Sequence, residues 1–144
     1  PKRFDAMSWF GRGPMDNYDD RKTGAAISMY KTSVQKDYFM FPQPQESGNK
    51  TEVRWLQLSD ETGKGIKITG KQLLNVAAVP YLQVAVQKAR HSFDLIPTDY
   101  ITVNIDLKQM GVGGDDSWSA NGIPHPEFML KEKKYQYSFI IQPQ

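Results

Sequence analysis

The sequence contains no cysteine, which excludes disulfide bonds and thiolate metal sites but does not by itself assign a redox compartment. It also lacks any apolar run approaching the ~18 residues of a membrane-spanning helix, so no membrane partner is expected. No secretory signal peptide opens the chain. It begins at Pro1 instead of Met, which favours an internal fragment or a processed product. Cytoplasmic and periplasmic locations both fit these features.

The net charge is small, because 18 basic and 16 acidic residues leave only +2. These charges are dispersed, whereas a nucleic-acid surface needs a concentrated basic patch, so no nucleic-acid partner is expected. At 144 residues the chain is one domain or a part of one. Its hydrophobic fraction of 39%, which includes many aromatic residues, is sufficient for a core.

Histidine is scarce as well, with only His91 and His125 present. Neither lies at a spacing typical of a zinc site, and no cysteine is available to complete one. No metal ligand is therefore expected on this chain. His125 lies between two prolines, which places it in a loop.

What the chain does contain is a series of short segments punctuated by Gly, Pro, Asn and Asp, which is typical of an all-β fold. Strands are predicted at residues 7–10, 25–34, 37–41, 51–58, 65–69, 100–106, 127–130 and 135–141. One short helix is predicted over residues 82–91, although the alternation at its start also fits a strand. Together these elements predict an antiparallel β-sandwich with one short helix. Period-two alternation predicts a core that includes Trp55, Ile101, Val103, Ile105, Tyr137 and Phe139.

The most informative segment is residues 110–119, which reads Met-Gly-Val-Gly-Gly-Asp-Asp-Ser-Trp-Ser. Glycine permits positive φ angles and close backbone approach. Asp and Ser hydrogen-bond to nearby backbone and hold tight turns. Such a loop is suited to presenting Trp118 at a fixed place. An indole beside Asp115 and Asp116 offers the flat apolar face and the hydroxyl acceptors that a sugar subsite needs.

Another interpretation of these residues stays open on the sequence alone. Trp118 would fold back into the core, as large aromatic residues commonly do. The carboxylates would then join Arg12, Arg21 or Arg54 in a buried network that pins the loops.

Asp115 and Asp116 do not form a catalytic pair. A retaining glycosidase needs two carboxyl groups about 5–5.5 Å apart on opposite sides of the glycosidic bond. Adjacent residues of an extended stretch point apart instead. Turn formation, ion pairing or contacts with sugar hydroxyls are the expected roles of this pair.

Residues 111–118 belong to a series of segments that resembles a known family. The other segments are Trp9-Phe10-Gly11-Arg12-Gly13-Pro14, Asn17-Tyr18-Asp19-Asp20-Arg21, Pro44-Gln45-Glu46-Ser47-Gly48-Asn49, Val53-Arg54-Trp55 and Asn104-Ile105-Asp106. In this order the series closely resembles the C-terminal, small-chain-like domain of the bacterial β-galactosidases of glycoside hydrolase family 2. The matches run almost from end to end of the chain.

The resemblance implies an enzyme that hydrolyses terminal β-D-galactosides with retention, of which residues 1–144 are the C-terminal domain. It implies half of a galactose-mutarotase-like supersandwich, incomplete at the N-terminal side, which leaves an open sheet edge. The family's catalytic glutamates and its magnesium and sodium sites lie on a TIM barrel of about 250 residues, so none falls on this chain.

One residue role transfers, that of Trp118 as a platform for the aglycone sugar at the entrance subsite. Asp115, Asp116 and Arg12 are candidate supports for it. The expected partners are the remaining domains of the parent enzyme, a galactoside such as lactose and, in a homo-oligomer, further copies.

Two other classes of function stay open. A stand-alone carbohydrate-binding module would use the same Trp118 but would bind sugar without a barrel. A purely structural or assembly domain would brace the barrel and contribute to oligomer contacts. In every case the isolated chain is expected to lack glycosidase activity, because it carries neither catalytic carboxylate.

Overall fold

The structure, a computed structural model, describes residues 1–144. The strands are β1 (Ala6–Gly13), β2 (Ala26–Ser33), β3 (Lys50–Ser59), β4 (Gly65–Val79), β5 (Thr102–Asp106) and β6 (Phe139–Pro143). The α-helices are α1 (Val34–Asp37) and α2 (Gln83–Lys88), and the 3₁₀ turns are η1 (Ser92–Asp94), η2 (Ala120–Gly122) and η3 (Pro126–Phe128). None of the helices is long and apolar enough to span a membrane.

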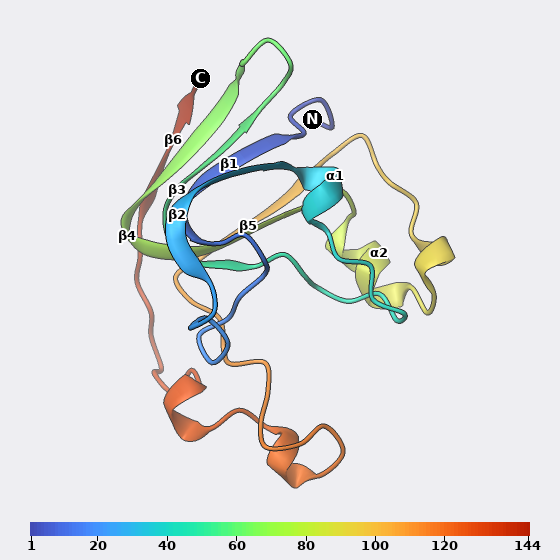
Figure 1. The fold of residues 1–144 in the computed structure, drawn as a ribbon, viewed down its shortest axis with the longest axis vertical. Coiled ribbons are helices and arrows are strands. Elements are labelled where there is room, and N and C mark those ends of the chain that lie inside the picture. The colour runs from blue at the N-terminus through green and yellow to red at the C-terminus, as the bar shows by residue number, and fades with distance from the viewer.

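The six strands form one antiparallel sheet in the order β2-β1-β3-β4-β5, and β6 also pairs with β4. β4 is 15 residues long and meets two neighbours in succession along one edge. Its residues 66–70 pair with β6, and its residues 75–79 pair with β5. The sheet curls strongly, so that β5 lies under β1 and β2 (Figure 1). The predicted all-β antiparallel fold is confirmed, and its place within a supersandwich stays a prediction.

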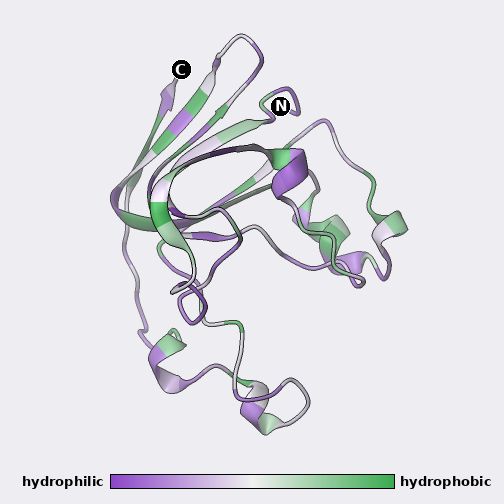
Figure 2. Cartoon of the chain, viewed as in Figure 1, coloured by the Kyte–Doolittle hydropathy of each residue, from purple (hydrophilic) through white to green (hydrophobic).

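The core lies inside this curl. Hydrophilic and hydrophobic residues follow one another along the first part of β4 (Figure 2), as expected where only one face of a strand is covered. The buried cluster consists of Met7, Trp9, Val34, Val53, Leu56, Leu58, Ile68, Leu74, Val76 and Ala78. The half-buried residues that pack against it include Ile101, Val103, Ile105 and Phe139. For these four half-buried residues the predicted core position is confirmed.

Trp55 was predicted in the core, and this is wrong. The pairing of β3 with β4 shifts register between Lys50 and Trp55, and Glu52 adopts a positive φ of 53°. Such a bulge re-aims the side chains that follow it. Val53 therefore faces the core, whereas Trp55 is only half-buried and has the ammonium of Lys67 4.9 Å from its ring centroid.

Residues 37–41 form no strand. The Ser33 hydroxyl accepts a hydrogen bond from the Lys36 N–H at 3.3 Å and caps α1, which places Val34 in the core. The predicted helix at residues 82–91 is confirmed as the shorter α2. The fold thus has two short α-helices where one was predicted.

The predicted pairing of residues 127–130 with the last strand is also wrong. Pro126 occupies the first turn of η3, where its fixed φ suits a helical start. β6 begins only at Phe139 and pairs with β4. Tyr137 precedes that strand and is 39% exposed, so it does not belong to the core as predicted.

A buried ion pair links β3 to α1. The Lys50 side chain is 1% exposed, and its Nζ lies 2.8 Å from Asp37 Oδ2 and 2.9 Å from the Gly48 carbonyl. The same ammonium lies 5.1 Å from the centroid of the Trp9 ring. Burial raises the pKa of Asp37, and Lys50 offsets part of that rise.

Candidate functional site

Residues 107–138, between β5 and β6, extend away from the sheet as an arm that carries only η2 and η3 (Figure 1). Trp118 lies on this arm and is 86% exposed, whereas Trp9 in the core is fully buried. The interpretation that folds Trp118 back into the core is therefore excluded. An indole exposed to this degree is available to a ligand or to a neighbouring domain.

The base of the Trp118 loop is held by a residue from the other end of the chain. Asp20 Oδ2 accepts hydrogen bonds from the N–H groups of Val112 at 2.9 Å and Gly113 at 3.0 Å. The Gly111 N–H donates to the Phe128 carbonyl at 2.9 Å. Three consecutive backbone groups are thus fixed, which orients the residues that follow them.

Two of the loop glycines are required by close packing. A Cβ on Gly114 would lie 2.0 Å from the Asn121 carbonyl oxygen and 2.4 Å from that of Ile123. A Cβ on Gly111 would lie 2.8 Å from Asp20 Oδ2. Positive φ angles occur at Gly48 and Gly63 and not in this loop, so close backbone approach is the reason for glycine here.

Asp116 fixes the backbone on either side of the indole. Its Oδ1 accepts the N–H groups of Trp118 at 3.0 Å and Ser119 at 2.8 Å. The Ser119 hydroxyl donates to Asp116 Oδ2 at 2.5 Å. These hydrogen bonds lower the pKa of Asp116 below its ordinary value of 3.8. The largest contribution comes from the hydroxyl of Ser119, and the two backbone N–H groups add to it.

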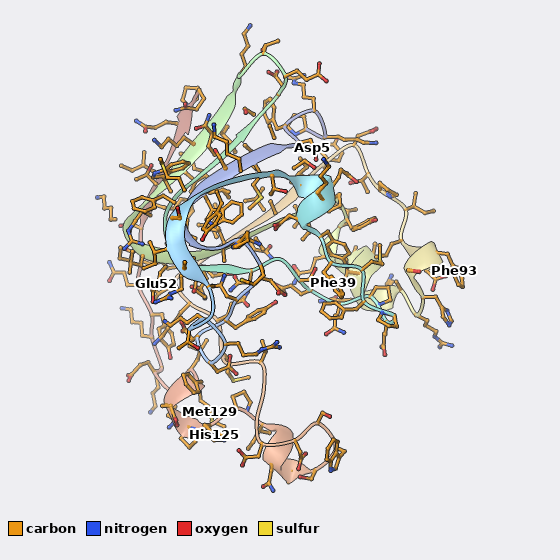
Figure 3. All side chains as sticks on the ribbon, in the orientation of Figure 1. Asp5, Phe39, Glu52, Phe93, His125 and Met129 are labelled. Atoms are coloured by element: carbon orange, nitrogen blue, oxygen red, sulfur yellow. The ribbon has the colours of Figure 1, made fainter.

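Asp115 makes a separate set of contacts. Its N–H donates to the Asn121 carbonyl at 2.8 Å. Its Oδ1 lies 2.7 Å from Nε2 of His125, and Nδ1 of that imidazole lies 4.0 Å from Glu127 Oε1. The hydrogen bond to Asp115 and the charges of both carboxylates raise the pKa of His125 above 6.5. His125 stands at the start of η3 (Figure 3).

Arg12 does not reach the Trp118 loop. Its Nε lies 3.0 Å from Glu52 Oε2, and its Nη1 donates to the carbonyls of Lys22 at 3.2 Å and Ala25 at 2.8 Å. Lys22 in turn pairs with Asp19 and Glu52, at 3.1 Å each. The expected network of an arginine with Asp115 or Asp116 is therefore not formed, and Arg12 pairs with Glu52 instead.

The contacts of Arg12 still bear on the loop, although indirectly. They hold the backbone at Lys22 and Ala25, which follow Asp20 in the sequence, and Asp20 fixes Val112 and Gly113. Sequence reasoning named Trp118, Asp115 and Asp116, which the structure brings together on one loop. It did not identify Asp20 and His125 as loop anchors, because only the fold brings Asp20 close to the loop and no spacing rule points to His125.

The Trp118 loop lines an open surface pocket of about 710 Å³. Its lining combines the indole, exposed apolar side chains and the two carboxylates, and comprises residues 112–119 with Gly122 and Ile123. A flat apolar face next to hydrogen-bond acceptors suits a sugar ring, which has one face of C–H groups and a rim of hydroxyls. The chain has no group of three or more His, Asp or Glu side chains placed to hold a metal ion.

Known proteins resemble this chain over nearly its whole length. The family described as "Beta galactosidase small chain" matches residues 1–141. The chain is 41% identical over 141 residues to a β-galactosidase of Priestia megaterium, a match that covers 97% of this chain and 13% of that protein. It is 40% identical over 145 residues to a β-galactosidase of Lactobacillus delbrueckii subsp. bulgaricus, covering 99% of this chain and 14% of the relative.

A third relative, the β-galactosidase of Halalkalibacterium halodurans, is 38% identical over 143 residues, which are 98% of this chain and 14% of that protein. The chain thus spans only 13–14% of the length of these relatives, so the matched enzymes carry further domains. Because the family match covers nearly every residue, the chain belongs to the β-galactosidase small-chain family.

Proposed function

We propose that this chain is the C-terminal domain of a β-galactosidase that hydrolyses terminal β-D-galactosides with retention. In this proposal the domain braces the catalytic barrel and supplies Trp118 as a platform at the substrate entrance subsite. The observation that carries the proposal is the 86% exposure of an indole that its own loop holds in place. The family match supports the parent activity.

The division of labour follows from the chemistry that this chain lacks. Asp115 is engaged with His125, and Asp116 with Ser119 and the adjacent backbone, so neither is a free acid or nucleophile. A barrel of about 250 residues does not fit within 144 residues. The family resemblance implies that the catalytic glutamates and the magnesium and sodium ions belong to the remaining domains. The chain alone should hydrolyse no galactoside.

The size of the Trp118 effect can be estimated. A buried aromatic side chain removes roughly 150–250 Å² of surface from water, and one stacked face accounts for about a quarter of that. At about 25 cal/mol per Å² this corresponds to roughly 1–1.5 kcal/mol, or about tenfold in affinity. A platform distant from the scissile bond contacts ground state and transition state alike, so its removal should act on KM more than on kcat.

The experiment compares Trp118→Ala with wild type in the complete enzyme, using lactose as substrate. KM should rise about tenfold with kcat nearly unchanged. Trp118→Phe should retain most of the affinity, because it keeps an aromatic face. Phe93→Ala is the matched control, because Phe93 is 79% exposed but lies on the η1 side of the molecule, away from the arm (Figure 3). Unchanged lactose kinetics in Trp118→Ala would reject the platform.

A stand-alone carbohydrate-binding module is the second candidate function, and the exposed Trp118 favours it as well. Calorimetry of the chain with lactose separates the two. One platform does not offset the entropy cost of association, so the proposed function predicts no measurable heat of binding. Saturable binding by the chain alone would favour the module.

A further inference from the structure

The pair formed by Asp115 and His125 closes the part of the arm that carries Trp118. The carboxylate and imidazole atoms lie 2.7 Å apart across ten residues of sequence. The hydrogen bond from the Asp115 N–H to the Asn121 carbonyl closes a smaller loop inside the first. Trp118 is therefore at the tip of a loop whose two ends are tied together. Tying the ends removes conformations that an open loop would sample.

The position of His125 is itself well defined. It lies between Pro124 and Pro126, whose rings fix their own φ angles, and Pro126 begins η3. The loop side of the pair is also constrained, because Asp115 is adjacent to Asp116, which caps the N–H groups of Trp118 and Ser119. A contact between His125 and Asp115 is thus transmitted to the indole over a short, hydrogen-bonded stretch.

We infer that His125 is a positioning residue for Trp118, and that its protonated imidazole holds the indole in the orientation that the substrate meets. This inference rests on the proposed function of Trp118 and adds a pH-dependent control of that same site. The partner of His125 is the carboxylate of Asp115, and the ligand that contacts Trp118 is the aglycone part of the galactoside.

The charged groups that face His125 come from two elements. Asp115 approaches Nε2 from the Trp118 loop, and Glu127 approaches Nδ1 from η3, at 4.0 Å. Both are carboxylates, so both favour the imidazolium, and the pKa of His125 lies above its ordinary 6.5. The ionic clamp is complete below pH 6.5 and is lost as pH rises through the raised pKa. Affinity for the aglycone should therefore fall on the alkaline side.

The test uses the complete enzyme and two substrates, lactose and methyl β-D-galactoside, whose aglycone is too small to cover an indole. The ratio of the two KM values cancels the titration of the catalytic carboxyls on the barrel. In wild type the ratio for lactose over the methyl glycoside should rise roughly two- to fivefold between pH 6 and pH 9, a size expected of an exposed ion pair. His125→Gln should show a ratio that is high and independent of pH, with kcat unchanged. Asp115→Asn should also give a high ratio that does not change with pH.

Trp118→Ala and the double variant Trp118→Ala/His125→Gln complete the cycle. If His125 acts through Trp118, its substitution has no further effect once the indole is gone. One outcome would overturn the role of His125 and leave the platform intact. In that outcome the pH profile of the KM ratio is the same in His125→Gln and wild type, but Trp118→Ala raises the ratio. A ratio that Trp118→Ala does not change overturns both.

Discussion

Gly114→Ala tests whether the geometry of the loop, and not merely the presence of an indole, sets the affinity for the substrate. A Cβ at this position would lie 2.0 Å from the Asn121 carbonyl oxygen and 2.4 Å from the Ile123 carbonyl oxygen. Both are backbone atoms, which cannot rotate out of the way as a side chain does. To reach even a tight 3.0 Å contact, the two segments must separate by about 1 Å.

A displacement of that size breaks the hydrogen bond from the Asp115 N–H to the Asn121 carbonyl, now 2.8 Å. The local cost is about 0.5–1.5 kcal/mol. The indole moves with the loop, and misplacement by about 1 Å is enough to lose most of a positioned contact. We expect the KM for lactose to rise between three- and tenfold, up to the effect of Trp118→Ala, with kcat nearly unchanged.

Gly113→Ala is the matched control, because the nearest atom to its added Cβ is Asp20 Oδ2, at 4.0 Å. The neighbouring glycine should thus tolerate the same methyl group with a KM within twofold of wild type. The assay is steady-state hydrolysis of lactose by the complete enzyme. Equal KM values for the two alanine variants would refute the claim that close approach at Gly114 sets the position of Trp118.

Two further predictions concern stability and pH. Lys50→Ala should lower the free energy of unfolding by about 3–5 kcal/mol in urea denaturation, because it leaves the carboxylate of Asp37 buried without its partner. Lys71 is exposed, so Lys71→Ala should change the free energy of unfolding by less than about 0.5 kcal/mol. Equal losses in the two variants would contradict the buried pair. Because the pKa of Asp116 is lowered, its hold on the loop is complete above pH 3.8 and is lost as pH falls through the lowered pKa. Carboxyl NMR titration should give Asp116 a pKa below 3.8 that rises in Ser119→Ala, and a wild-type value at or above 3.8 would count against this.

Most strands could be predicted from the sequence because one of their faces is buried and the other is not. This holds for β1, where Met7 and Trp9 alternate with more exposed residues. The prediction stopped too early in β4, whose residues 74–79 are all buried. Leu74 belongs to the cluster inside the curl, and Val79 packs against Tyr38 and Tyr81 outside it. A strand covered on both faces loses the period-two signal.

The errors at Trp55 and at residues 37–41 have different physical causes. A bulge reverses the facing of a side chain without changing the local composition, so alternation alone does not reveal it. Residues 38–41 include three aromatic residues that favour strands. The structure instead forms a helical turn at Val34–Asp37, capped by Ser33, and no strand pairs with the residues that follow it.

The sequence alone identified only those residues of the candidate site that lie close together along the chain. Trp118, Asp115 and Asp116 lie within four residues of one another. Asp20 is more than ninety residues away along the chain, and the curl of the sheet brings it to the loop. Contacts between residues so far apart depend on the fold and cannot be inferred from the spacing of residues in the sequence.

The central claim, that Trp118 forms part of the substrate entrance subsite, is tested most directly by a crystal structure of the complete enzyme. The structure should contain lactose bound to a catalytically inactive variant. We predict that the indole of Trp118 lies within about 4–4.5 Å of the aglycone ring. An indole that contacts no atom of the sugar, with lactose bound in the active site, would contradict the account.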